Sequence, residues 1–145
     1  MSFFDQLGAL FAKYDVLGAF WVNIQLTFWA AIGSFVLGAI LALMRISPVP
    51  SLRWAGTIYV HLFRNTPLTI LMTLALLGVW TQFQLSFSTD FETNFFVYAV
   101  IVLSIYHASF VCEAIRSGVN TVPTGQAEAA RAIGLGFMDT ARMII

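Results

Sequence analysis

Three apolar stretches follow one another along the chain, and each is bounded by charged or turn-forming residues. The first, at residues 22–44, contains no charged side chain. At ~1.5 Å per residue it is long enough to cross the ~30 Å hydrocarbon core of a bilayer. The second occupies residues 66–85 and begins at a proline that suits a first helical turn, where Asn65 or Thr66 would cap the helix. With the third at residues 95–113, the pattern predicts three transmembrane helices.

Small side chains recur at every fourth position of the first stretch. The positions are Ala30, Ser34, Gly38 and Ala42. In lipid, where apolar helices gain little from hydrophobic burial against each other, such a stripe allows two helices to approach closely. The alternative interpretation is that lipid-facing helices simply tolerate small residues.

The composition indicates a protein that is partly covered by lipid. Of its 145 residues, 59% are hydrophobic and 10% are charged, and the mean hydropathy is +0.85. A soluble domain carries about 25% charged residues. The formal net charge of +0 and the scattered arginines exclude a nucleic-acid partner. The single cysteine, Cys112, lies in an apolar run and is expected to be a small buried hydrophobic residue.

Positive charges are distributed unevenly between the connections. The arginines lie between the first two stretches or after the third, at Arg45, Arg53, Arg64, Arg116, Arg131 and Arg142. The connection between the second and third stretches has Asp90 and Glu92 but no Lys or Arg. The positive-inside rule then places the N-terminus outside and the chain after Glu113 in the cytosol. We expect an all-α, multi-pass protein of the cytoplasmic membrane, with a single domain over residues 1–145.

No motif in the sequence indicates catalysis. There is no GxxxxGK[ST] loop for nucleotide phosphates, no His/Cys/carboxylate cluster at metal-ligand spacing and no recognisable nucleophile beside a base. We therefore expect neither an enzyme nor a bound cofactor or metal.

The two histidines allow more than one interpretation. The segment after Pro50 has the pattern of an interfacial helix, on which His61 is expected to face solvent or headgroups rather than to relay protons. His107 lies inside the third apolar stretch, where an ionisable side chain favours a bundle interior or an aqueous path. With Ser104 it could line a translocation path, or it could be a neutral histidine that bonds a neighbouring helix.

Residues 122–145 have the pattern of a short helix, a glycine turn and a second helix. The run from Glu128 to Ile133 consists largely of strong helix formers, and Gly134 can adopt the positive φ that ends a helix. A second helical pattern starts at Phe137. Such a compact cytosolic segment is well shaped to lie in a groove of another protein.

Two motifs resemble a known family, the permease subunits of bacterial ABC importers for polar amino acids. The first is Arg64-Asn65-Thr66-Pro67 with the following leucine, at the start of the second stretch. The second runs from Glu113 through Val122-Pro123 to Leu135 and is similar to the family's cytoplasmic EAA loop and the segment leading into it. The similarity covers the chain from Trp21 onward and is nearest to the glutamate-importer permeases of high-GC Gram-positive bacteria.

The resemblance implies a transporter subunit that takes its energy from partners. Two cytosolic ABC ATPase subunits, a second permease subunit and an extracytoplasmic amino-acid-binding protein would act with it, and glutamate would be the substrate. Contact with the ATPase would fall on the EAA loop residues Gln126, Glu128, Ala129, Ala130, Gly134, Leu135 and Phe137.

The resemblance also implies that the family fold continues beyond this sequence. The family motif extends past Ile144 and is followed by two further membrane helices, whereas the sequence stops at Ile145. We therefore expect an incomplete permease domain without the last two helices. The rival interpretation is a membrane structural or channel-like subunit with no ATPase partner, and a membrane enzyme would need catalytic residues outside this sequence.

Overall fold

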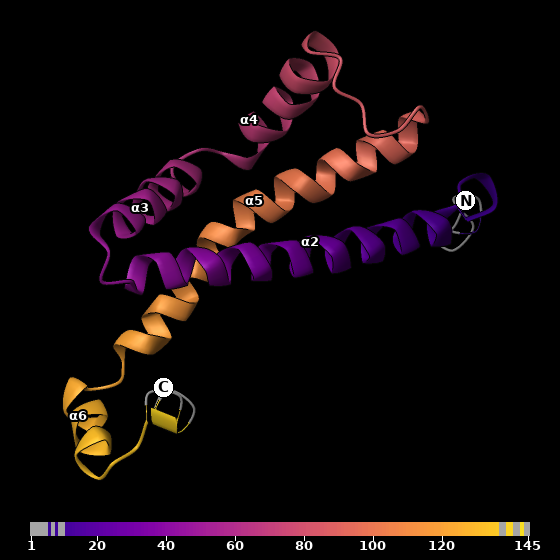
Figure 1. Ribbon diagram of the computed structural model, residues 1–145. Coiled ribbons are helices and arrows are strands. Elements are labelled where there is room, and N and C mark those ends of the chain that lie inside the picture. The colour runs from indigo at the N-terminus through magenta and orange to yellow at the C-terminus, as the bar shows by residue number, and fades with distance from the viewer. Residues whose placement is uncertain (1–5, 7, 9–10, 137–138, 141–142, 144–145) are drawn as a thin grey trace.

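The computed structural model describes residues 6, 8, 11–136, 139–140 and 143 (Figure 1). Its elements are helices, and the described residues contain no strand. In chain order they are α2 (Val16–Ile46), α3 (Pro50–Arg64), α4 (Leu68–Thr73), η1 (Leu74–Gln82), α5 (Phe91–Asn120) and α6 (Thr124–Ala132). The all-α fold expected from the sequence is confirmed.

Helices α2 and α5 are each long and apolar enough to cross a membrane. The predicted spans 22–44 and 95–113 lie inside these longer helices. Both helices begin at an aspartate, because the Asp15 carboxylate accepts a hydrogen bond from Gly18 N (2.9 Å) and the Asp90 carboxylate accepts one from Thr93 N (2.8 Å). Hydrogen bonding from Thr93 lowers the pKa of Asp90, because these bonds favour the charged carboxylate.

The second predicted span is part of a bent pair of helices. Helix α3 and the α4–η1 segment meet at 96°, and they count as a third span if the bent pair is one broken span rather than a re-entrant loop. The bend lies at residues 65–67, where Pro67 has no N–H to donate and disfavours the helical conformation of Thr66. Beyond α4 the chain winds as the π-helix η1, in which the Thr81 hydroxyl donates to the carbonyl oxygen of Leu76 five residues earlier (2.8 Å).

The expected cap of the second span is wrong. Asn65 lies at the C-terminal end of α3, and its N–H donates to the carbonyl oxygen of His61. The Thr66 hydroxyl donates back to the carbonyl oxygen of Leu62 (2.8 Å). Neither side chain caps α4, whose N-cap residue is Pro67. The Asn65 N–H and the Thr66 hydroxyl both bond to carbonyl groups in the last turn of α3. They do so because α3 extends farther toward the proline than the sequence pattern indicated.

The small-residue stripe of α2 packs against α5, as its spacing predicted. Its members Ala30, Ser34, Gly38 and Ala42 are buried, and α2 and α5 lie side by side along much of their length (Figure 1). A Cβ built on Gly38 would lie 2.6 Å from the Val111 Cβ and 2.9 Å from the Ala108 carbonyl oxygen. The two backbones can therefore approach this closely only because position 38 has no side chain.

We predict that Gly38→Ala destabilises the protein although alanine favours helices. Overpacking of a close contact costs about 1–3 kcal/mol, which exceeds the ~1 kcal/mol gained in helix propensity. Gly118→Ala is the matched control, because a Cβ at Gly118 on the same pair of helices meets no atom within 4 Å. Thermal unfolding of the detergent-solubilised protein should show a lower midpoint for Gly38→Ala alone. Equal midpoints for the two variants would contradict the packing argument.

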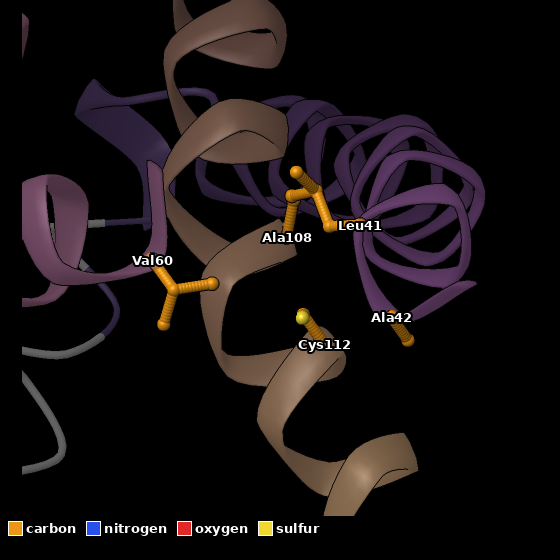
Figure 2. Close-up of a cluster of buried hydrophobic side chains, with 5 residues drawn as sticks. All are labelled: Leu41, Ala42, Val60, Ala108 and Cys112. Atoms are coloured by element: carbon orange, nitrogen blue, oxygen red, sulfur yellow. The ribbon is translucent and has the colours of Figure 1, made fainter. Parts of the chain in front are cut away.

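A cluster of apolar side chains joins α2, α3 and α5 (Figure 2). Its buried members are Leu41, Ala42, Val60, Ala108 and Cys112. The Tyr59 hydroxyl lies beside it and donates to the Ile105 carbonyl oxygen (2.8 Å). Cys112 is 0% exposed, so the prediction of a small buried hydrophobic residue is confirmed.

Acidic and basic residues are distributed unevenly between the two ends of the helical bundle. Asp90 and Glu92 lie at the start of α5, at the same end of the bundle as the start of α2 (Figure 1). Arg45 and Arg116 lie toward the other end, from which α5 leads into α6. This arrangement has the charge asymmetry on which the predicted orientation in the membrane depends.

Candidate coupling segment and transmembrane grooves

Helix α6 follows the end of α5 and lies beyond the rest of the bundle (Figure 1). A short turn at residues 121–123 separates the two helices, and Pro123 precedes the first residue of α6. Among the described residues, α6 packs extensively against none of the other helices. Its connection to the bundle within this part of the chain is therefore the end of α5.

The end of α6 is a Schellman motif. Gly134 has φ +90°, as its place after the helix predicted. The N–H of Gly134 donates to the carbonyl oxygen of Arg131 (3.0 Å), and the N–H of Leu135 donates to that of Ala130 (3.0 Å). These two bonds satisfy carbonyl groups that the helix end would otherwise leave unpaired. Gly134 thus turns the chain sharply and fixes the direction in which it leaves α6.

The residues predicted to contact an ATPase differ in exposure. Gln126, Glu128, Ala129 and Gly134 are exposed, Leu135 is half-buried and Ala130 is only 3% exposed. Phe137 lies outside the described residues. Four of these side chains and the Gly134 backbone can therefore meet a partner, whereas the Ala130 side chain is covered by the chain itself.

The sequence interpretation missed an exposed apolar residue at the end of α6. Ile133, directly before Gly134, is 80% exposed. A large apolar side chain on an otherwise small and polar surface is a strong candidate for burial against a partner. Because Ile133 sits where α6 ends, a helical periodicity argument could not assign it to either face.

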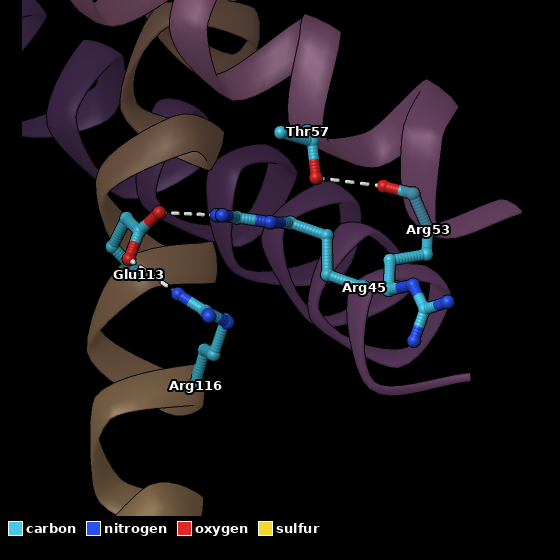
Figure 3. A network of polar contacts seen from close by, with 5 residues as sticks. All are labelled: Arg45, Arg53, Thr57, Glu113 and Arg116. Carbon is cyan, nitrogen blue, oxygen red and sulfur yellow. Dashed lines mark hydrogen bonds and ion pairs between the residues drawn. The ribbon is translucent and has the colours of Figure 1, made fainter. Parts of the chain in front are cut away.

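A cluster of charged side chains lies near the end of the bundle that carries α6 (Figure 3). The Glu113 carboxylate of α5 forms an ion pair with Arg45 of α2 and a longer one with Arg116 of its own helix (3.7 Å). Arg53 of α3 points away from this carboxylate, and its carbonyl oxygen accepts a hydrogen bond from Thr57 (2.7 Å). Arg116 is only three positions from Glu113, whereas Arg45 is 68 positions away, so local spacing along the sequence does not indicate the pair with Arg45.

The Arg64-Asn65-Thr66-Pro67 motif forms the break between α3 and α4. The guanidinium of Arg64 lies over the Phe110 ring of α5, with its Cζ 5.5 Å from the ring centroid. This distance is within the range of a cation–π interaction, which connects the break to α5.

His107 and Ser104 line different grooves. His107 lines a groove of about 420 Å³ between α2 and α5 that also contains Thr27 and Ser34. Ser104 lines another groove, of about 410 Å³, next to Trp29 and Gly33. The Nδ1 of His107 lies 2.9 Å from the carbonyl oxygen of Leu103 on its own helix. The structure of this chain therefore does not bring the two residues of the candidate translocation path together.

The described residues contain no group of three His, Cys, Asp or Glu side chains that could hold a metal ion. A groove of about 320 Å³ between α4–η1 and α5 is lined almost entirely by apolar side chains, among them Leu71, Val79 and Ile101. The two long apolar helices, the bent helix pair and the small polar segment that projects from one end define a polytopic membrane protein.

Comparison with known proteins identifies the family. The family model described as "binding-protein-dependent transport system inner membrane component" matches residues 13–145, and the chain belongs to this family. It is an inner-membrane protein with several membrane-spanning helices.

Its relatives include amino-acid permeases. The glutamate transport system permease protein GluC of Corynebacterium efficiens is 48% identical over 90% of this chain and 60% of its own length. The corresponding protein of Corynebacterium glutamicum is 46% identical over the same shares. The glutamate/aspartate import permease GltJ of Escherichia coli is 32% identical over 94% of this chain and 60% of its own length. The chain thus spans about 60% of the length of these permeases.

A solved structure shares the fold. The crystal structure of an amino acid ABC transporter with histidines superimposes with a TM-score of 0.69 at 30% identity. The match covers 83% of this chain and 53% of that one.

Proposed function

We propose that this chain belongs to the membrane-spanning permease subunit of an ATP-driven importer for a polar amino acid. It would act with two cytosolic ABC ATPase subunits, a second permease subunit and an extracytoplasmic amino-acid-binding protein. The permease would perform no covalent chemistry. It would couple the closure of the ATPase subunits and the arrival of the loaded binding protein to a change between two conformations of the helices.

The observation that carries this proposal is the helix–glycine segment beyond α5. It stands apart from the bundle, it ends in a Schellman motif at Gly134, and it exposes Glu128, Ala129 and Ile133. A short rigid helix with small side chains and one apolar anchor can enter a groove at low cost in conformational entropy. We infer that this surface contacts the ATPase.

Glutamate is the substrate that the relatives favour. Three of the permeases named above carry glutamate in their names. His107 contributes a polar side chain to the groove between α2 and α5, and it remains our candidate for a residue that lines the amino acid's route. Ser104 is the weaker candidate, because it lines the other groove beside apolar side chains.

Uptake of labelled glutamate tests the proposed substrate. Cells that express the full-length permease with its ATPase and binding protein should accumulate glutamate, and unlabelled glutamate should compete more strongly than glutamine or arginine. Cells that accumulate labelled glutamine or arginine but no labelled glutamate would keep the importer and reject glutamate.

Copurification tests the proposed class. The ATPase should copurify with the full-length permease and should be lost when residues 126–134 are deleted. A membrane structural or channel-like subunit would show no bound ATPase with or without this segment.

A further inference from the structure

Glu113 sits where α5 leaves the helical bundle. Helix α2 ends at Ile46, whereas α5 continues for seven residues past Glu113, about 10 Å of helix, before the turn into α6. Since α6 packs extensively against no other described helix, a displacement of α6 reaches this part of the bundle through that free end of α5.

The contacts between α2 and α5 differ sharply in kind along their length. In the apolar part, small residues such as Ala30 and Gly38 face α5, with a long hydrogen bond from the Ser104 hydroxyl to the Ala30 carbonyl oxygen (3.5 Å). Packing of this kind is non-directional, and packed helices commonly shift past one another by small sliding motions. At the end nearest α6, the Arg45 side chain is only 8% exposed and pairs with Glu113, which is 28% exposed. A charge-assisted pair between partly desolvated groups fixes distance and direction in a way that the apolar contact does not.

On the basis of the function proposed above, we propose that the Arg45–Glu113 pair clamps α2 to α5, so that both helices move together when the ATPase displaces α6. Arg45 and Glu113 are then positioning residues for coupling, and neither needs to touch the transported amino acid. Arg116 is on the same helix as Glu113 and cannot perform this task, although its guanidinium lies 3.7 Å from the carboxylate.

The number of substrate molecules transported per ATP hydrolysed tests the clamp. The full-length permease is reconstituted in proteoliposomes with its ATPase and binding protein. We expect Glu113→Gln to lower this ratio about tenfold while the basal ATPase rate stays the same, because a lost coupling energy of 1–3 kcal/mol corresponds to a change of roughly 5–150-fold. Arg45→Glu combined with Glu113→Arg restores a pair between the helices and should bring the ratio back to within about threefold of the original.

Arg116→Gln is the matched control, because it removes a charge near Glu113 without breaking the link between helices. It should leave the ratio within about twofold. A normal ratio in Glu113→Gln, or an Arg116→Gln variant as impaired as Glu113→Gln, would overturn the clamp.

A second variant covers the case in which Glu113→Gln fails to assemble because Arg45 is left unpaired. Arg45→Met with Glu113→Met removes both charges and leaves none buried alone. Stable assembly with a lowered ratio supports the clamp, and stable assembly with a normal ratio rejects it. Failure of the proposed function looks different, since the unchanged permease would then retain no ATPase and show no transport coupled to hydrolysis.

Discussion

Gly134→Val is expected to reduce amino-acid uptake at least about tenfold while leaving membrane insertion and the α2–α5 bundle unchanged. At φ +90° a β-branched residue is strained by about 1–3 kcal/mol. A Cβ at this position meets no atom within 4 Å, so the effect comes from the backbone rather than from a clash. Relief of the strain would break the bonds from Gly134 and Leu135 and redirect the chain after α6. Since about 1.4 kcal/mol corresponds to a tenfold change in binding, docking on the ATPase should weaken accordingly.

Two further variants separate this effect from a general loss of helix. Gly125→Ala changes a glycine in the first turn of α6 that has ordinary φ and open space around it, and it should leave uptake intact. The uptake of Gly134→Asn should lie between that of the unchanged protein and that of Gly134→Val, because asparagine tolerates positive φ better than other side chains. Uptake, the amount of permease in the membrane and the amount of copurified ATPase are measured together. If uptake and ATPase binding in Gly134→Val equal those of the unchanged protein, the turn has no role in coupling.

Ala129→Trp is expected to abolish ATPase binding, with a decrease in uptake of more than about tenfold. The Ala129 side chain is exposed, so a larger residue has space within this chain and α6 should still form. In a groove that closely fits a small side chain, the added indole must displace partner atoms, and overpacking of a fitted contact costs about 1–3 kcal/mol or more. The expected loss therefore arises at the interface with the ATPase.

The matched control is Ala12→Trp, another exposed alanine near the predicted outer end of the bundle. It introduces the same side chain away from α6 and should leave uptake and ATPase copurification unchanged. The copurified ATPase is quantified by gel densitometry alongside uptake. Normal ATPase binding in Ala129→Trp would show that this face of α6 is not the docking surface.

Local chemistry made much of the fold predictable. The uninterrupted apolar run at residues 22–44 indicated a membrane-spanning helix, and the small-residue stripe within it indicated the face that α5 covers. The positive φ of Gly134 followed from its place after a run of strong helix formers. In each case neighbouring residues within a few turns determine the outcome.

Features that depend on distant residues were not predictable in the same way. The ion pair joins Arg45 and Glu113 across 68 positions, and only the packing of two helices brings them together. Ser104 and His107 are three residues apart, yet they line different grooves, because different residues of α2 lie beside each of them. The capping assignment failed because the side chain of Thr66 bonds back to α3 and does not reach forward to α4.

Photo-crosslinking from position 133 tests the docking claim most directly. A photo-crosslinking amino acid replaces Ile133, the 80% exposed apolar residue beside the Gly134 turn, in the full-length permease expressed with its ATPase. After irradiation of intact cells, we predict a covalent product that contains the permease and the ABC ATPase, and we predict its loss in the Ala129→Trp background. A product with lipid alone, or none in a permease that transports normally, would contradict the assignment of this segment as the ATPase-docking surface.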